Sequence, residues 1–124
     1  MSVEKISAVT LKVTSMQTSV RFYHDLLGME VIYGGEHGCF SSLRTWNPKD
    51  PILNLEQGRA MTQWGRLIFY VREVDAFWRY LREKGFQPES PRDASWGERY
   101  FHMYDPDGHE LSFAQPIRRV PAVA

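Results

Sequence analysis

The side chains with the widest chemical repertoire in this sequence are four histidines and one cysteine, and their spacing matches no common catalytic motif. His102 and His109 flank residues 105–108, whose proline and glycine fit a tight turn, so these two imidazoles are a candidate metal-binding pair. The sequence contains no Gly-x-Ser-x-Gly elbow, no Gly-x-x-x-x-Gly-Lys loop and no His-Glu-x-x-His zinc motif. Because isolated histidines are common at protein surfaces, we favour the interpretation that all four are ordinary surface or partly buried residues that bind no metal.

The composition excludes several classes of function. The chain has 124 residues, 15 lysines and arginines balance 15 aspartates and glutamates, and nucleic-acid or anionic-membrane binding needs a basic excess. The longest uncharged apolar run, Leu67–Val71, is too short to cross a membrane, and the first residues do not resemble a signal peptide. Cys39 is the only cysteine, so no internal disulfide can form. We therefore expect a cytoplasmic protein.

Hydrophobic periodicity in the first half of the chain predicts a β-α-β-β-β order. Residues 6–13 alternate between apolar and polar side chains, which predicts a strand with one buried face. Ser15 is a candidate N-cap for a helix that continues at helical spacing to Leu27 and ends at Gly28. Three further strands are predicted at Met29–Tyr33, Cys39–Trp46 and Ile52–Glu56.

The second half of the chain repeats this order. Residues 66–72 alternate again, and an apolar stripe over residues 74–81 predicts a helix that ends before Gly85. Further strands are predicted at Phe86–Glu89, Arg99–Tyr104 and Glu110–Gln115. Equivalent residues lie 58 positions apart, as 13 and 71 do. The chain is therefore predicted to be a tandem repeat of one module.

Two motifs and the repeated modules resemble a known superfamily. The motifs are the helix end Phe22-Tyr23-x-x-Leu26-Leu27-Gly28 and the turn Asp105-Pro-Asp-Gly-His109. Over residues 6–115 the chain resembles the vicinal oxygen chelate superfamily of glyoxalases, bleomycin-resistance proteins and extradiol dioxygenases. The resemblance implies an α+β fold, in which tandem βαβββ modules form a cupped mixed sheet with helices on the outer face. Residues 1–124 are expected to form one domain from modules 5–58 and 64–116, with a C-terminal tail at 117–124.

The resemblance also identifies where a metal would be held. Metal-using members carry histidine and glutamate ligands on the first and last strand of each module. In this sequence these four places are occupied by Ala8, Asn54, Arg66 and Ser112. None supplies a carboxylate, imidazole or thiolate, and the fixed charge of Arg66 opposes a cation. We therefore expect a metal-free relative without a cofactor.

Strand alternation predicts which side chains face the cup that the resemblance implies. In the strand before the turn, Tyr100 and His102 face the cup, whereas Phe101 and Met103 face the core. Aromatic and polar side chains on one surface fit a small-molecule site. The predicted ligand-binding residues are Arg66, Tyr70, Asn54, Ser112, Tyr100, His102 and Trp46.

Two alternative roles are open to Arg66. A guanidinium on the concave face needs a counterion, because a buried unpaired charge costs several kcal/mol. It either pairs with Glu56, Glu98 or Glu110, or it holds a ligand's carboxylate, phenolate or ring carbonyl. The segment Ser95-Trp-Gly-Glu-Arg99, just before the strand predicted at Arg99–Tyr104, resembles a segment of the drug-sequestering, bleomycin-resistance branch, whose members bind flat ligands between aromatic surfaces.

The leading hypothesis is a homodimer that binds a planar aromatic or anionic small molecule in a metal-free cavity. The alternative is an enzyme of the same superfamily, a lyase, isomerase or ring-modifying enzyme acting on a small metabolite. In that case His102, Glu98 or Glu110 would move a proton while the arginine stabilises an enolate or phenolate. A third possibility is an assembly or regulatory domain whose cup is filled by its own side chains.

Overall fold

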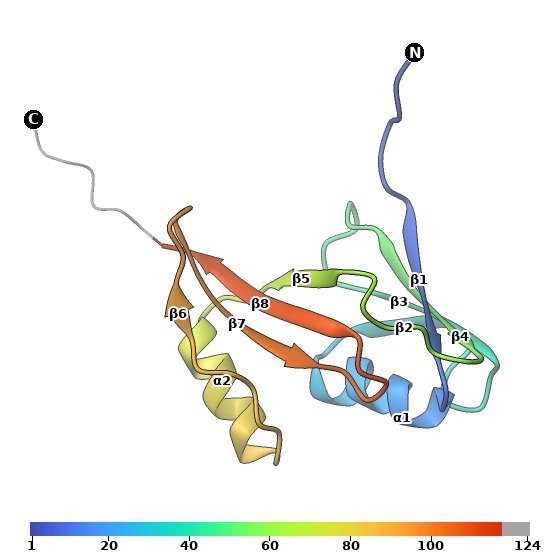
Figure 1. Cartoon of the computed structure of the whole chain (residues 1–124). Helices are drawn as coiled ribbons and strands as arrows, with labels where there is room; N and C mark the ends of the chain where they lie inside the picture. The colour runs from blue at the N-terminus through green and yellow to red at the C-terminus, as the bar shows by residue number, and fades with distance from the viewer. Residues whose placement is uncertain (118–124) are drawn as a thin grey trace, which may run out of the picture. The chain divides into compact units, whose positions relative to one another are not determined.

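The computed structural model describes residues 1–117 and divides the chain into two compact units. The first unit comprises Met1–Thr62 and Asp105–Gly108, and the second comprises Gln63–Tyr104 and the chain from His109 onward. Each unit has its own four-stranded mixed sheet with a helical segment (Figure 1). The predicted C-terminal tail lies, apart from Ile117, outside the described residues.

The first unit has the predicted β-α-β-β-β order. Its elements are β1 (Ala8–Val13), α1 (Met16–Val20), η1 (Arg21–Leu26), β2 (Glu30–Tyr33), β3 (Phe40–Arg44) and β4 (Ile52–Gln57). The strand order is β1-β4-β3-β2, in which β1 and β4 are parallel and the other pairs antiparallel. Ser15 caps α1 as predicted, because its hydroxyl accepts a hydrogen bond from the backbone N–H of Thr18.

The second unit repeats this topology. Its elements are β5 (Arg66–Tyr70), α2 (Val74–Glu83), β6 (Arg92–Asp93), β7 (Glu98–Tyr104) and β8 (Glu110–Pro116), with strand order β5-β8-β7-β6. Arg66 pairs with Glu110 across the parallel strands β5 and β8, just as Ala8 pairs with Ile52 across β1 and β4. In each pair the two residues lie 44 positions apart in the sequence (110 − 66 and 52 − 8). The predicted α+β class and repeated βαβββ module are confirmed.

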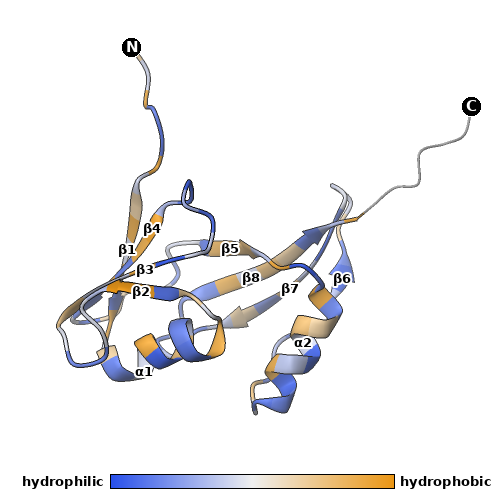
Figure 2. Cartoon of the chain, turned by 180° about the vertical axis from the view of Figure 1, so that it is seen from behind, coloured by the Kyte–Doolittle hydropathy of each residue, from blue (hydrophilic) through white to orange (hydrophobic). Residues whose placement is uncertain are grey.

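Burial alternates along β5 and along Phe101–Tyr104 of β7 as predicted, whereas in β8 four consecutive residues, 111–114, are buried. In the second unit, Phe101 and Phe113 are buried and stack with their ring centroids 5.3 Å apart. Phe77 of α2 also contacts Phe113, at 5.1 Å, so the helix covers the apolar face of this sheet. Figure 2 shows hydrophobic and hydrophilic residues interspersed along β7 and β8. The opposite face of the sheet is therefore left for polar side chains.

The first helical segment differs from the regular helix that its spacing predicts. After Val20 the helix widens into the π-helix η1, in which the N–H of Leu27 donates to the carbonyl of Phe22 at 3.1 Å. The wider turn buries the adjacent rings of Phe22 and Tyr23, which pack edge to face. Gly28 ends the segment as predicted, with a backbone φ of +78° that residues other than glycine rarely adopt.

The strand predicted at Phe86–Glu89 is wrong. The short strand β6 forms instead at Arg92–Asp93, where Arg92 pairs with Tyr100. Pro88 lies inside the predicted segment and has no N–H to donate to a ladder. Only one backbone hydrogen bond, from Glu89 N–H to the carbonyl of His102, connects this segment to β7 at 3.1 Å.

The turn that follows β7 belongs to the first unit, where it fastens the helical segment. The backbone N–H and hydroxyl of Thr14 donate to Asp107 Oδ1 at 3.1 and 2.5 Å. The hydroxyl of Tyr23 donates to Asp105 Oδ2 at 2.7 Å. Tyr23 is fully buried, and this burial, followed by the charge of Asp105, raises the pKa of its hydroxyl well above the ordinary value. The predicted tight turn is confirmed, since Gly108 N–H donates to the carbonyl of Asp105.

Within residues 1–117, no helix is both long and apolar enough to span a membrane.

Candidate functional site

The strongest candidate site is a pocket of about 200 Å³ on the polar face of the second unit's sheet. It is lined by side chains of β5, β7 and β8 and of the loop before β7, namely Arg66, Ile68, Trp96, Glu98, Tyr100, His102, Ser112 and Ala114. At roughly 30 Å³ per water molecule, its volume equals that of about seven waters. The pocket therefore suits a single ring with small substituents.

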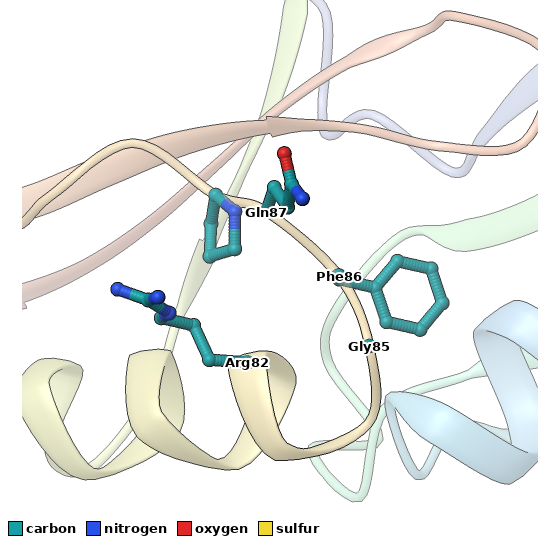
Figure 3. A pocket seen from close by; sticks show the side chains of 5 residues that line it. Arg82, Gly85, Phe86 and Gln87 are labelled. Carbon is teal, nitrogen blue, oxygen red and sulfur yellow. The ribbon is translucent and has the colours of Figure 1, made fainter.

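A larger pocket, of about 590 Å³, lies at the C-terminal end of α2 (Figure 3). Its one charged lining residue, Arg82, already lies over the ring of Trp78, with the guanidinium carbon 4.9 Å from the ring centroid. None of the predicted ligand-binding residues lines this pocket. We therefore assign the candidate site to the smaller pocket.

Arg66 lies at the centre of the interactions in the smaller pocket. Its Nη2 lies 3.3 Å from Glu110 Oε1, so Glu110 rather than Glu56 or Glu98 is its partner. Its Nη1 lies 3.3 Å from Nε2 of His102. The Arg66 side chain is 44% exposed, and a guanidinium has five N–H donors. The ion pair thus leaves donors that a ligand can reach.

The hydrogen bonds of His102 fix which ring nitrogen carries the proton. Arg66 can only donate, so Nε2 of His102 must accept its hydrogen bond. The proton of the neutral ring is then on Nδ1, which donates to the Ser112 hydroxyl oxygen at 2.6 Å. Burial, followed by the charge of Arg66, holds the pKa of His102 below its ordinary value of 6.5. A neutral imidazole is the form that fits this site.

The lowered pKa of His102 predicts a pH-dependent stability. As the pH falls below about 6.5, the unfolded chain binds a proton at this residue before the folded chain does. The stability associated with neutral His102 is therefore complete above that pH and is lost as the pH falls. Denaturant titrations between about pH 8 and pH 5 should show that the free energy of unfolding falls more steeply with pH for the wild type than for His102→Gln. An equal fall for the two proteins would contradict a lowered pKa at His102.

Aromatic rings and one carboxylate form the outer part of the pocket. Trp96 and Tyr100 stack with centroids 5.7 Å apart, and Trp96 is 67% exposed. The indole N–H of Trp96 donates to Glu98 Oε1 at 2.7 Å, and the hydroxyl of Tyr70 donates to Glu98 Oε2. The bond to Glu98 raises the pKa of Tyr70. Gly97, with a φ of +93°, provides the turn between Trp96 and Glu98.

The structure brings four of the predicted residues together and places three elsewhere. Arg66, Tyr100, His102 and Ser112 line one pocket, and Tyr70 contacts it through Glu98. The other two predicted residues lie in the first unit, where Asn54 accepts a hydrogen bond from Ser42 at 2.7 Å and Trp46 is 94% exposed.

The predicted set of ligand-binding residues does not include four residues that line the pocket. Trp96 and Glu98 belong to the Trp-Gly segment, whose resemblance to a ligand-binding segment was the available signal. Ile68 and Ala114 share the alternation of Arg66 and Ser112, respectively, and so lie on the same face. Strand parity therefore places Ile68 and Ala114 on the pocket face, whereas Trp96 lies outside any strand and parity cannot place it.

The residues at the four family metal positions do not fit a metal ion. Arg66 carries a positive charge, and the side chain of Ala8 has no atom that can ligate a metal. The oxygen of Asn54 accepts a hydrogen bond from Ser42, and the hydroxyl oxygen of Ser112 accepts one from His102. Throughout the described part of the chain, no three histidine, cysteine, aspartate or glutamate side chains group closely enough to hold one. His109, the other member of the candidate histidine pair, is buried, and its Nδ1 accepts a hydrogen bond from the indole of Trp64 at 2.9 Å.

Comparisons with known proteins agree with this fold. A lactoylglutathione lyase from Agrobacterium tumefaciens has a TM-score of 0.74 and 16% identity, over 91% of this chain and 94% of the lyase. A possible glyoxalase from Bacillus cereus has a TM-score of 0.75 and 21% identity, over 91% of this chain and 100% of that one. A glyoxalase/bleomycin resistance protein/dioxygenase from Nocardioides has a TM-score of 0.72 and 20% identity, over 100% of this chain and 91% of that one. Identities this low show the fold alone.

The family comparison is more specific than these structural matches. No curated protein matches the chain. The family model of the Glyoxalase/Bleomycin resistance protein/Dioxygenase superfamily, in contrast, matches residues 5–113, which include both repeated modules almost completely. The chain therefore belongs to the glyoxalase/bleomycin resistance protein/dioxygenase superfamily.

Proposed function

We propose that this protein binds a small planar aromatic or anionic molecule in the pocket around Arg66, without a metal ion. The observation that carries the proposal is a partly exposed guanidinium in the same pocket as the stacked rings of Trp96 and Tyr100. A carboxylate or phenolate oxygen would accept a charge-assisted hydrogen bond from the arginine, and a flat ring would pack on the aromatic faces. Small-molecule sites combine apolar surface with a few placed polar groups in this way.

A fluorescence titration tests the proposal. Benzoate, salicylate, 4-hydroxybenzoate and flat heteroaromatic compounds would be added to the protein while tryptophan emission is recorded. At least one compound should give a saturable change, which Trp96→Phe should greatly reduce because this indole lines the pocket. Trp78→Phe is the matched control, since Trp78 lies outside the pocket and donates to the carbonyl of Pro88. A broad panel without any saturable binder would count against the proposal.

Metal content gives a second prediction. Because the four family positions supply no carboxylate, imidazole or thiolate, the purified protein should contain far less than one zinc, nickel, iron or manganese ion per chain. Elemental analysis measures this directly. About one metal ion per chain, together with stability that is lost on chelation, would contradict the metal-free proposal.

The geometry favours binding over serine-based catalysis. Ser112 and His102 lie 2.6 Å apart, which is the distance expected of a nucleophile and its general base. Here, however, Arg66 occupies Nε2 of His102 and leaves the proton on Nδ1, so the imidazole donates to the serine and cannot accept its proton. The enzymatic alternative would be supported by a new product when the tightest ligand is incubated with the protein.

The proposal includes a cytoplasmic homodimer. Several large apolar side chains are exposed on the isolated chain, among them Ile68 and Tyr70 of β5. Exposed apolar surface often marks an interface between subunits. Sedimentation at micromolar concentration should therefore give the mass of a dimer, and a monomer would contradict this part of the proposal.

A further inference from the structure

We propose that the pocket selects a dipolar aromatic ligand, which carries an acidic group at one end and an amino group at the other. This inference rests on the proposed function, because it concerns the same pocket. It adds a second charged end to the ligand, and it follows from the distribution of donors and acceptors over the pocket wall.

One end of the pocket presents only donors to a ligand. Arg66 has N–H groups beyond those that contact Glu110 and His102. The hydroxyl oxygen of Ser112 accepts the Nδ1 proton of His102, so the proton of this hydroxyl is left to donate. A group that can only accept, such as a carboxylate, matches both residues.

The other end presents an acceptor with a negative charge. Glu98 lines the pocket and accepts hydrogen bonds from Trp96 and Tyr70, which are both neutral donors. Within residues 1–117, no lysine, arginine or histidine forms an ion pair with Glu98. A carboxylate has about four acceptor sites, so two donors leave room for a ligand's N–H. An ammonium group would also supply a countercharge that no ion pair within residues 1–117 gives Glu98.

The space between the two charged side chains is bounded by aromatic rings. Trp96 stacks on Tyr100, whose ring in turn lies edge to face with His102 at 5.1 Å. An aromatic ring can pack on these surfaces, and a cationic group near Trp96 gains a further attraction to the indole face. With a volume of about 200 Å³, the pocket accommodates one ring with a substituent at each end.

Four matched compounds test the inference by calorimetric titration. Benzoate has only the acid, benzylamine has only the amine, and 3- and 4-(aminomethyl)benzoate have both. The better of the two aminomethylbenzoates should bind about tenfold or more tightly than benzoate and than benzylamine, as an added charge-assisted hydrogen bond predicts. Glu98→Gln should remove this advantage, so that the aminomethylbenzoates bind this variant no more tightly than benzoate does. Glutamine keeps one oxygen to accept from the Trp96 indole, and its amide N–H can donate to the Tyr70 hydroxyl, but it has no charge to pair with an ammonium group.

Two control variants test whether the preference depends on the charge of Glu98 alone. Glu83→Gln removes the same charge from the exposed side of α2 and should leave all four affinities unchanged. Arg118 and Arg119 follow β8 in the sequence, and the double variant R118Q/R119Q should retain the preference for the dipolar compounds. If benzylamine or the dipolar compounds bind appreciably only to this double variant, the chain itself neutralises Glu98 and the inference is overturned.

The outcomes separate this inference from the proposed function. Equal affinities for benzoate and both aminomethylbenzoates, with or without Glu98→Gln, would overturn the dipolar preference while leaving aromatic-acid binding intact. A wild-type protein that binds none of the four compounds, and no compound of the wider panel, would overturn both.

Discussion

Replacing Arg66 with alanine is expected to weaken the binding of the tightest acidic ligand by about 10- to 100-fold, which corresponds to a lost charge-assisted hydrogen bond of roughly 1.5–3 kcal/mol. The fold should lose less than about 1 kcal/mol, because the ion pair with Glu110 is partly exposed and such pairs contribute little. Calorimetric titration and denaturant unfolding of the same variant measure both quantities.

A matched variant controls for the loss of an exposed, paired arginine. Arg44 forms an ion pair with Glu30 at 3.0 Å in the first unit, and its side chain is similarly exposed. Arg44→Ala should therefore reproduce the small stability change of Arg66→Ala without affecting ligand affinity. If Arg66→Ala instead lost roughly 3–5 kcal/mol of stability with unchanged affinity, Arg66 would be a structural residue rather than a ligand-binding one.

The largest effect on folding is expected from Asp105→Ala. This change leaves the hydroxyl of Tyr23, which is fully buried, without its carboxylate acceptor at 2.7 Å. It also removes the acceptor for the backbone N–H of Asp107 at 2.9 Å. We expect a loss of about 3 kcal/mol in the free energy of unfolding, the sum of a lost charged hydrogen bond and an unpaired buried group.

Asp105→Asn separates the hydrogen bond from the shape of the side chain. Asparagine keeps an oxygen that can accept from Tyr23, so this variant should lose clearly less stability than Asp105→Ala. Urea unfolding, with the slope checked for two-state behaviour, gives both values. Similar losses for the two variants, or a loss below about 1 kcal/mol for alanine, would show that this contact contributes little to the stability of the fold.

Those features of the fold that depend on periodicity were predictable from the sequence. A strand's period of two residues places Phe101 and Met103 on one face and His102 on the other, whatever the surroundings. The repeat spacing implied equivalent strand pairings in the two modules, as the parallel registers of β1 with β4 and β5 with β8 confirm. The strand predicted at Phe86–Glu89 is the exception, because Pro88 has no N–H to donate to a strand ladder.

The candidate site was less predictable, because it depends on side-chain conformations. Parity gave the face of Arg66 but not its partner, and three glutamates were equally plausible until the structure selected Glu110. Trp96 lies before β7, outside any strand, so alternation could not place it in the pocket. The hydrogen bond from Tyr23 to Asp105 joins residues 82 positions apart, and no local pattern predicts such a contact.

The most direct test of ligand binding at Arg66 is a nitrogen–proton NMR titration of the four tryptophan indole groups. Chelator-treated protein would receive the tightest ligand, with the signals assigned by single Trp→Phe variants. Binding at Arg66 predicts that the Trp96 signal shifts saturably, because its N–H donates to Glu98 in the pocket, while those of Trp46 and Trp78 stay in place. An unchanged Trp96 signal at saturation, or a shift that requires added metal, would contradict metal-free binding in this pocket.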